Sequence, residues 1–433
     1  MPIFFFKKKE INLDKSILSD PIVKELGRYP FKEFDRTTPQ EIILDPSSTS
    51  GSSGALRRMD IQKEEKALTY YKKQFLRSKK IDNTDSSLSL QELIAGNLYR
   101  ITGCKAPKQK IFVRKIRGDS KYAPRVDAGS KSLDLRQLKD KSDLLQYIRN
   151  WETDGNLKAL KEISRLMGAT LALGDYDRNP ANYYFDLKDG LFGKMDHDRT
   201  FTRPRNDRHA YADPNFVIHV YFIEALCQKK SIADQTINTL TDNLNDNIRR
   251  SENASRYSQF DDGLFKLDTR SKEWSYNPEV FNTQTIDRIK ENDADTFMFV
   301  SFLKSVRNFT DMPQEIKSYL FKPKNLLGDV WGKLPLHTQE DLLLHGKRLF
   351  DKFEENLKDL RGILELPLQR LNELEESLRQ KGAPVPKISV NYDAAVKFIT
   401  TAQKNHMTLH QLKELIKNTK DLEEKKGFQF FLR

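Results

Sequence analysis

Acidic and amide side chains gather in two short stretches of the chain, GDYDRNPANYYF at residues 174–185 and MDHDRTF at residues 195–201. Asp177 lies five residues before Asn182 in the first stretch, and Asp196 follows in the second. Phosphoryl transfer depends on a carboxylate that orients or deprotonates the acceptor hydroxyl, and on metal ions that neutralise the phosphates. Carboxylate and amide oxygens are suitable Mg²⁺ ligands. The two stretches therefore predict Asp177 as the catalytic base and Asn182 and Asp196 as metal ligands.

The alternative for the same residues is a turn followed by a hairpin with solvated acids, because Asp, Asn and Pro favour turns through local hydrogen bonds. Asp175 also lies in the first stretch and shares the chemistry of Asp177. The neighbouring elements give Asp175 no role in the transfer, so we expect it to brace the turn or the loop.

The elements before the two stretches follow from the hydrophobic pattern. Leucine and isoleucine residues between positions 90 and 101 have helical spacing, and Gly103 follows where a helix would end. Short apolar runs on either side are typical of strands. We expect a strand at 41–44, a Gly/Ser-rich loop at 45–54, a hairpin of strands at 55–61 and 67–75, a helix at 90–101 and a strand at 110–116.

The later part of the chain is mainly helical in pattern, apart from one hairpin. Asp189-Gly190 is a strong hairpin turn signal between two short apolar runs. We expect helices at 143–151 and 157–173, a hairpin of strands at 182–185 and 191–195, mainly helical structure over 215–325 with a polar stretch near 250–275, and amphipathic helices after Pro335 and over 409–422.

The sequence DRNPAN at 177–182, followed by MDHDRTF, resembles the catalytic and metal-binding loops of the protein-kinase-like superfamily. The likeness is to its atypical branches: the phosphatidylinositol kinases, the HipA-type kinases and the secretory-pathway kinases. These enzymes carry D-R-x-x-x-N where conventional protein kinases carry H-R-D. Residues 91–107 resemble the passage from the helix to the next strand in these enzymes. The resemblance extends over residues 36–325 in the order of elements, and only the two loops are specific.

The resemblance implies an α+β, bilobal protein-kinase-like fold, here with an additional C-terminal all-α domain. We expect an N-terminal arm at 1–35, an N-lobe at 36–135, a C-lobe at 136–325 and a helical C-terminal domain at 326–433. The resemblance also implies ATP and Mg²⁺ as cofactors, with the γ-phosphoryl group of ATP transferred to a hydroxyl.

The resemblance further implies a nucleotide-binding lysine on the third strand of the N-lobe, paired with a glutamate of the helix. Lys72 in TYYK is the preferred lysine, and Lys73 is the alternative because a slip of one residue exchanges the faces of a strand. Glu92 is the expected partner. Ser89-x-x-Glu92 also fits a capping box, in which Glu92 would serve only the start of the helix.

Two departures from the superfamily pattern keep an inactive pseudokinase open as an alternative. The loop at 46–54 is rich in serine and lacks G-x-G-x-x-G, although its hydroxyls and amides are suited to phosphate. Asp198 stands where the metal-binding loop usually has glycine.

The formal net charge of +12 favours an anionic partner, such as nucleic acid, a phospholipid surface or a small polyphosphate. No recognised nucleic-acid-binding motif is present, so that class ranks last. Our hypothesis is that an inositol polyphosphate or a phosphoinositide headgroup binds a basic cluster and stimulates the kinase. An exposed basic face or a protein-docking surface is the alternative. The candidate anion-binding residues are Arg114, Lys115, Arg117, Arg203, Arg205 and Arg208.

A serine or threonine hydroxyl of a protein is the preferred acceptor, because the region after Asp198 is long enough to form a peptide-binding segment. A phosphoinositide kinase is the second choice, since the D-R-x-x-x-N likeness and the basic residues suit an anionic lipid. A non-catalytic scaffold or a nucleic-acid-binding protein is the third.

The chain has only two cysteines, Cys104 and Cys227, which argues against a disulfide framework and fits a reducing, cytoplasm-like compartment. No apolar run reaches the roughly 18 residues that a membrane span requires, so we expect a soluble protein. The tail at 421–433, acidic and then hydrophobic, resembles the C-termini of type IV-secreted bacterial effectors. That resemblance implies action on a protein of a host cell, with the C-terminal domain as a candidate for peripheral membrane contact.

Overall fold

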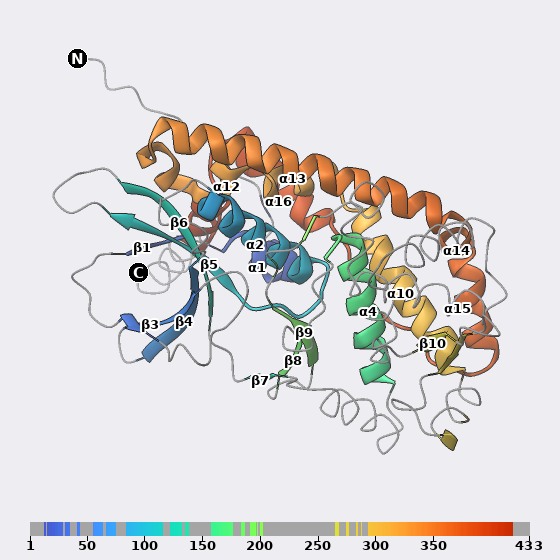
Figure 1. The fold of residues 1–433 in the computed structure, drawn as a ribbon. Helices are drawn as coiled ribbons and strands as arrows, with labels where there is room; N and C mark the ends of the chain where they lie inside the picture. The colour runs from blue at the N-terminus through green and yellow to red at the C-terminus, as the bar shows by residue number, and fades with distance from the viewer. Residues whose placement is uncertain are drawn as a thin grey trace, which may run out of the picture.

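The computed structural model is drawn in Figure 1. It describes residues 13, 15–28, 31–34, 41–43, 55–63, 66–74, 84–115, 122–131, 135–137, 157–175, 183–186, 191–195, 197, 200–201, 265–267, 274–276, 283–284, 287 and 293–418. Helices predominate among these residues, and their strands form three sheets. The loop expected at 45–54 and the helix expected at 143–151 lie outside them.

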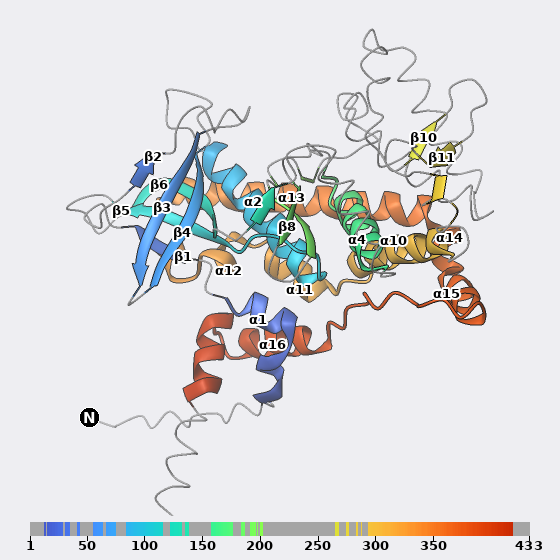
Figure 2. The same ribbon diagram turned by 90° about the horizontal axis from the view of Figure 1, so that it is seen from below.

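The largest sheet has six strands: β1 (Phe31–Phe34), β2 (Glu41–Ile43), β3 (Ala55–Lys63), β4 (Lys66–Gln74), β5 (Gln109–Lys115) and β6 (Tyr122–Lys131). Their order is β1-β5-β6-β4-β3-β2, and neighbours are antiparallel except for the parallel pair of β1 and β5 (Figure 1 and Figure 2). The predicted hairpin is confirmed as β3 and β4, and the strands predicted on either side are confirmed as β2 and β5. β1 lies within the expected N-terminal arm and adds an edge strand to this sheet.

Helix α2 (Thr84–Ile101) packs against β5 and β6. Its leucine and isoleucine side chains between 90 and 101 all have exposed fractions of 2% or less, which confirms the predicted apolar face. The helix ends as predicted, because Gly103 has a φ of 83° and the Cys104 amide donates a 2.8 Å hydrogen bond to the Tyr99 carbonyl. The start was predicted too late, since α2 begins at Thr84.

Two helices from opposite ends of the chain also pack against α2. They are α1 (Pro21–Leu26) and α13 (Leu336–Ile363). On the side of α1, Arg100 of α2 forms an ion pair of 3.1 Å with Glu25. The sheet, α1 and α13 together fix the position of α2 in the interior.

The middle of the chain contributes helix α4 (Lys158–Ala172) and a small sheet of β7 (Leu135–Gln137), β8 (Tyr183–Asp186) and β9 (Leu191–Lys194). The helix predicted at 157–173 and the hairpin of β8 and β9 are confirmed. A second hairpin, β10 (Phe265–Leu267) with β11 (Trp274–Tyr276), was not predicted, because a polar stretch was expected there.

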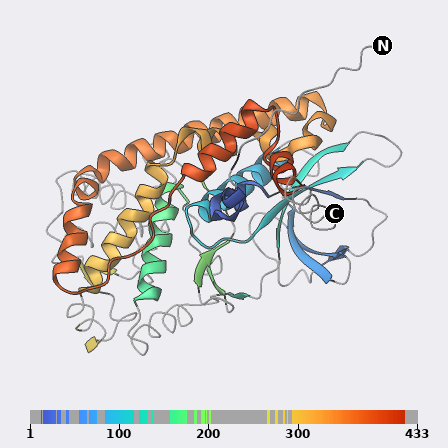
Figure 3. The ribbon, with the colours of Figure 1, turned by 180° about the vertical axis from the view of Figure 1, so that it is seen from behind.

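The C-terminal part is helical, as predicted. It contains α10 (Ala294–Thr310), α11 (Gln314–Leu320), α12 (Pro323–Leu327), η4 (Gly328–Lys333), α13, α14 (Glu365–Gln369), α15 (Leu371–Gln380), α16 (Asp393–Lys404) and a helical segment at 409–418. α10 lies beside α4 (Figure 1). α16 returns to the N-terminal segment and packs against α1 and η1 (Lys15–Ser19) (Figure 2 and Figure 3).

The buried apolar side chains of these elements form one contiguous cluster, which runs from Leu13 to Ile416 in the sequence. The buried face of α13 belongs to it, including Leu349 and Phe353, as expected for one of the amphipathic helices predicted after Pro335. None of the helices in the described segments combines the length and apolar character needed to cross a bilayer.

Asn356 of α13 connects this long helix to the C-terminal end of α4. Its side-chain amide donates to the carbonyls of Leu171 at 3.0 Å and Ala172 at 2.7 Å, and the side chain is buried. Carbonyls in the last turn of a helix have no partner within the helix. Asn356 therefore supplies a donor to the end of α4 that a helix cannot supply itself.

We expect Asn356→Leu to lower the free energy of unfolding by about 1–3 kcal/mol, because a leucine of similar size leaves a buried carbonyl without a donor. Urea denaturation of the wild type and the variant would measure the change. An unchanged free energy of unfolding would show that the two hydrogen bonds do not stabilise the end of α4.

Candidate functional site

Four side chains from separate parts of the chain meet in the interior, and we refer to Tyr99, Asp175, Lys194 and His197 as the Asp175 cluster. Each has an exposed fraction of 1% or less. The Lys194 ammonium lies 2.8 Å from Asp175 Oδ2, and the Tyr99 hydroxyl donates to the same oxygen at 2.9 Å. The ring of His197 stacks on that of Tyr99 with centroids 4.7 Å apart, and His197 Nδ1 lies 3.7 Å from Asp175 Oδ2. The cluster joins α2, the end of α4 and the end of β9.

The end of α4 fixes the position of Asp175. Gly174 has a φ of 58°, a conformation that glycine adopts without the steric cost of a Cβ. Its amide donates to the Leu171 carbonyl at 3.0 Å, and the Asp175 amide donates to the Thr170 carbonyl at 2.8 Å. This pair of hydrogen bonds is the Schellman motif. The chain therefore turns directly from the helix to Asp175.

Backbone pairing on two sides fixes the position of Lys194. The register of β8 and β9 places Tyr183 opposite Lys194. The Lys194 amide also donates to the Lys105 carbonyl at 3.2 Å, just beyond the end of α2. Gly193 permits this approach, because a Cβ there would lie 2.7 Å from the ring of Tyr184 and 2.9 Å from the Cβ of Lys105.

The charges of the cluster are balanced within it. Burial alone would raise the pKa of the Asp175 carboxyl, but the attraction of Lys194 and the other interactions in the cluster outweigh burial and hold that pKa below its ordinary value. Asp175 is therefore ionised near neutral pH and pairs with Lys194. Burial lowers the pKa of His197 to about 4, so its imidazole is neutral under the same conditions. Asp175 is enclosed and paired, which confirms a bracing role and excludes it as a base in contact with substrate.

The predicted transfer residues Asp177, Asn182 and Asp196 lie outside the described residues, next to the cluster in sequence. Asp177 follows Asp175 by two residues, Asp196 directly precedes His197, and Asn182 directly precedes β8. The Asp175 cluster thus contains described residues of both acidic stretches.

Glu92, the predicted partner of the nucleotide lysine, is buried on α2 with an exposed fraction of 4%. The side-chain amide of Gln109, the first residue of β5, donates to Glu92 Oε1 at 3.4 Å. The capping-box interpretation is wrong, because α2 begins at Thr84 and Ser89 lies within the helix. Glu92 is therefore an interior helix residue at the boundary between α2 and the sheet.

The candidate lysines are consecutive residues of β4. Lys72 is paired with Arg57 and Gly129, and Lys73 is paired with Leu56. The backbone places both in the centre of the sheet, so both stay candidates. Of the predicted anion-binding residues, Arg114 and Lys115 belong to β5, whereas Arg117, Arg203, Arg205 and Arg208 lie outside the described residues.

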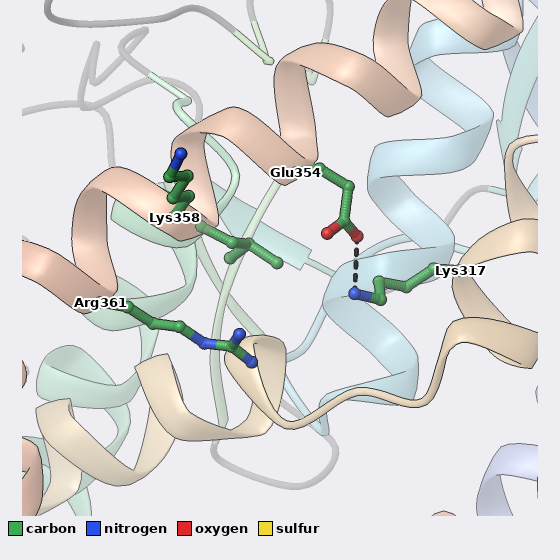
Figure 4. Close-up of a pocket in the computed structure, with 5 residues that line it drawn as sticks. Lys317, Glu354, Lys358 and Arg361 are labelled. Carbon is green, nitrogen blue, oxygen red and sulfur yellow. Dashed lines mark ion pairs between the residues drawn. The ribbon is translucent and has the colours of Figure 1, made fainter.

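A separate pocket of about 110 Å³ lies between α11 and α13, lined by Lys317, Glu354, Leu357, Lys358 and Arg361 (Figure 4). Lys317 pairs with Glu354 at 2.6 Å, and Arg361 donates to the carbonyl of Thr310. Both of these cations already interact with other groups of the protein. We therefore interpret the pocket as a structural contact between the two helices. Within the described segments, no group of three or more His, Cys, Asp and Glu side chains is placed to hold a metal ion.

Three members of the cluster, Tyr99, Lys194 and His197, were not predicted as site residues. Lys194 carried a usable signal, because it is a charged residue at the end of a short strand, directly ahead of an acidic stretch. Tyr99 carried no such signal, since a tyrosine on the apolar face of a helix is usually an ordinary core residue.

The chain resembles a solved kinase structure at low sequence identity. No protein-family model matches it, and no curated protein matches it. Its structure is similar to the crystal structure of CtkA, a proinflammatory kinase of Helicobacter pylori, with a TM-score of 0.36 and 14% identity. That likeness covers 79% of this chain and 99% of the other. A kinase is thus among the structures that resemble this chain in fold.

A pH dependence of stability is expected from His345 of α13. Burial, with repulsion from Lys352 and Arg348, lowers its pKa to about 4. The unfolded chain takes up this proton near pH 6.5 and the folded chain only near pH 4. The free energy of unfolding should therefore fall as the pH decreases across this window, by at most about 1.4 kcal/mol per pH unit.

Thermal unfolding of the wild type and of His345→Leu, followed from pH 7 to pH 4, would test this. The Tm of His345→Leu should decrease less with falling pH than the Tm of the wild type. His337→Leu, at an exposed position of the same helix, should show the same decrease in Tm as the wild type. Identical slopes for the wild type and His345→Leu would contradict the expectation.

Proposed function

We propose that the chain is an ATP- and Mg²⁺-dependent kinase of the atypical protein-kinase-like type, which transfers the γ-phosphoryl group of ATP to a hydroxyl of a protein. One observation carries the proposal. The Asp175 cluster joins the end of α4 to the end of β9 through the ion pair of Asp175 and Lys194. The two acidic stretches with the predicted transfer residues begin at these two ends.

Chain connectivity limits the distance of each transfer residue from the cluster. Two residues span at most about 7 Å, which bounds the separation of Asp177 from Asp175. Asp196 is bonded directly to His197. Asn182 is bonded to Tyr183, whose register partner is Lys194. These constraints support a common site for the three transfer residues at the open end of the β8–β9 hairpin.

The three side chains have different roles in the proposed transfer. When bound, ATP supplies the phosphoryl group, and Mg²⁺ neutralises the charge of the phosphates. The carboxylate of Asp196 and the amide oxygen of Asn182 are ligands that suit Mg²⁺ and would hold it. Asp177 would accept the hydrogen bond of the acceptor hydroxyl, orient that hydroxyl and take up its proton. Asp175 is not available for this step, because it is buried and paired.

The six-stranded sheet and α2 provide the elements that a nucleotide clamp requires. In protein kinases the nucleotide lysine lies on the third strand and pairs with a glutamate of the next helix. Lys72, or Lys73, and Glu92 would take these roles here, with residues 36–135 as the N-lobe. The second lobe at 136–325 would contain α4 and the β8–β9 hairpin, and residues 326–433 would form the additional helical domain.

The preferred acceptor is a serine or threonine of a host protein, because the chain after Asp198 is long enough to form a peptide-binding segment. A phosphoinositide headgroup is the second candidate, favoured by the net charge of +12 and by the D-R-x-x-x-N likeness. Regulation by an inositol polyphosphate, secretion into a host cell and peripheral contact with a membrane rest on the sequence alone and belong to the same proposal.

We expect Asp177→Ala to lower ATP turnover by about 10²–10⁴-fold without unfolding the protein, because the acceptor hydroxyl loses its base. Labelled ATP with Mg²⁺, incubated separately with host protein extract and with phosphoinositide vesicles, would measure the transfer and identify the class of acceptor. Circular dichroism would verify that the variant is folded.

Asp311→Ala is a suitable control, because the Asp311 side chain is half exposed, forms a surface ion pair with Arg307 and accepts a 3.3 Å hydrogen bond from the neighbouring Thr310. It should retain the turnover of the wild type. Near-normal turnover in folded Asp177→Ala would refute the assignment of the base. If the wild type shows no turnover in either mixture, the proposal that the protein is an enzyme is refuted and a pseudokinase scaffold is favoured.

A further inference from the structure

The first half of α13 carries apolar side chains on the surface of the molecule. Among the described residues, the exposed large apolar side chains are Leu336, Leu343 and Leu344, with exposed fractions of 69%, 47% and 50%. All three belong to α13, which runs along one edge of the molecule (Figure 1). Single exposed leucines are ordinary, but a group of them on one helix indicates a contact surface.

The geometry of the helix places the three leucines on one outward face. Successive residues of an α-helix are rotated by about 100°. Leu336, Leu343 and Leu344 have the spacing i, i+7 and i+8, so they lie on the same side of α13. Leu349 and Phe353 lie on the opposite side and are buried in the core. The core therefore fixes the direction in which the three leucines point.

Two exposed residues of opposite charge, Glu340 and Lys347, lie on the same outward face. Glu340 is four residues before Leu344, and Lys347 is four residues after Leu343. They are seven residues apart, which is about 10.5 Å along the helix axis. Side chains of one helix interact at separations of three or four residues. Glu340 and Lys347 therefore flank the two central leucines, one toward each end of the helix.

We refer to Leu336, Glu340, Leu343, Leu344 and Lys347 as the leucine face. We propose that it docks on the leucine face of a second copy of this chain, with the two α13 helices antiparallel. A twofold axis between Leu343 and Leu344 brings the central leucines of both copies together. This inference does not depend on the proposed function.

The positions of the two charges select the antiparallel arrangement. Glu340 and Lys347 each lie about 5 Å from the twofold axis along the helix, in opposite directions. Antiparallel helices therefore place Glu340 of each copy opposite Lys347 of the other, which gives two ion pairs. Parallel helices would place Glu340 against Glu340 and Lys347 against Lys347, and like charges in contact are repulsive.

The leucine face suits a second copy better than a lipid surface. Its one acid and one base leave it without net charge, and an acid between the leucines is repelled by anionic lipids. A twofold dimer requires a patch that is complementary to itself, and this face meets that requirement. One helix face is a small interface, so we expect a weak and reversible dimer.

Sedimentation velocity of the full chain would measure the association. We expect a dimer with a Kd of roughly 10–100 µM, at the weak end of specific complexes. Leu344→Glu should raise this Kd at least about tenfold, because it places two charges at the centre of the contact. Leu344 is half exposed, so the variant should keep the helix content of the wild type in circular dichroism. A wild type that stays monomeric up to about 300 µM would overturn the proposal and assign the face to another protein.

Charge reversal tests which residues face each other. Glu340→Lys and Lys347→Glu each create two repulsive pairs per dimer, so either change alone should raise Kd about tenfold. The double variant Glu340→Lys/Lys347→Glu restores both ion pairs, and its Kd should lie within about threefold of the wild type. An equimolar mixture of the two single variants should form a heterodimer, because every facing pair is then of opposite charge.

Glu315→Lys is the matched control, since Glu315 is an exposed glutamate of α11 outside the leucine face. It should leave Kd unchanged. A double variant that associates as weakly as the single variants would contradict the antiparallel pairing.

Disulfide cross-linking locates the twofold axis. Cys227→Ser provides the background, and the remaining Cys104 is buried. Leu344→Cys lies beside its counterpart at the axis, so oxidation should link the two copies. Leu336→Cys lies about 11 Å from the axis, which separates the two thiols by about 22 Å and should prevent a disulfide. Links at both positions would indicate parallel helices, and links at neither would show that the leucine faces do not meet, so either result would overturn the proposal.

Discussion

A carboxylate with almost no exposed surface requires a compensating charge, and in this protein that requirement is met at Asp175. Lys194 supplies the charge and Tyr99 supplies a hydrogen bond. Because these partners come from β9 and α2, the charge is satisfied only when α4, β9 and α2 are all in place. Gly174 adopts a left-handed conformation, and Gly193 lies close to Tyr184 and Lys105. Each glycine thereby allows the backbone to reach the cluster. One electrostatic constraint thus joins α4, β9 and α2 within an otherwise apolar core.

The elements that pack around α2 hold this helix in the position that the cluster requires. α2 lies on the sheet, α1 is tied to it by Glu25 and Arg100, and α13 packs along it. α1 is held in turn by α16, and Lys413 donates to the carbonyl of Gly27 at 3.3 Å. The first and the last described helices therefore support the same element. Residues after 326, which were expected to form a separate helical domain, contribute to the same apolar cluster as the earlier elements.

Much of this architecture could be predicted because it depends on local pattern. The apolar face of α2, the β3–β4 and β8–β9 hairpins and the apolar face of α13 follow from residue spacing and turn residues, and the structure confirms them. The Asp175–Lys194 pair could not be predicted in this way, because its partners are separated by an entire hairpin and only the tertiary fold brings them together. The start of α2 was missed for a related reason. Ser89 has the residue type of a cap, but packing of α2 against the sheet and α13 extends the helix beyond it. Bracing by Asp175 was foreseen, but its partners were not.

The sequence presents Asp175 and Asp177 as equal acids, and the structure shows the surroundings of Asp175. The charge of Asp175 is cancelled one for one by Lys194 in a space closed to solvent. Asp196 lies two residues after Lys194 in the sequence. If Asp177 and Asp196 meet in one site, as proposed, their like charges lie close together, which is costly. A divalent metal ion and the proton of an acceptor hydroxyl are what such a pair requires. Asp175 is held in an ion pair with Lys194, whereas Asp177 and Asp196 are the acids proposed to meet the hydroxyl and the metal ion in phosphoryl transfer.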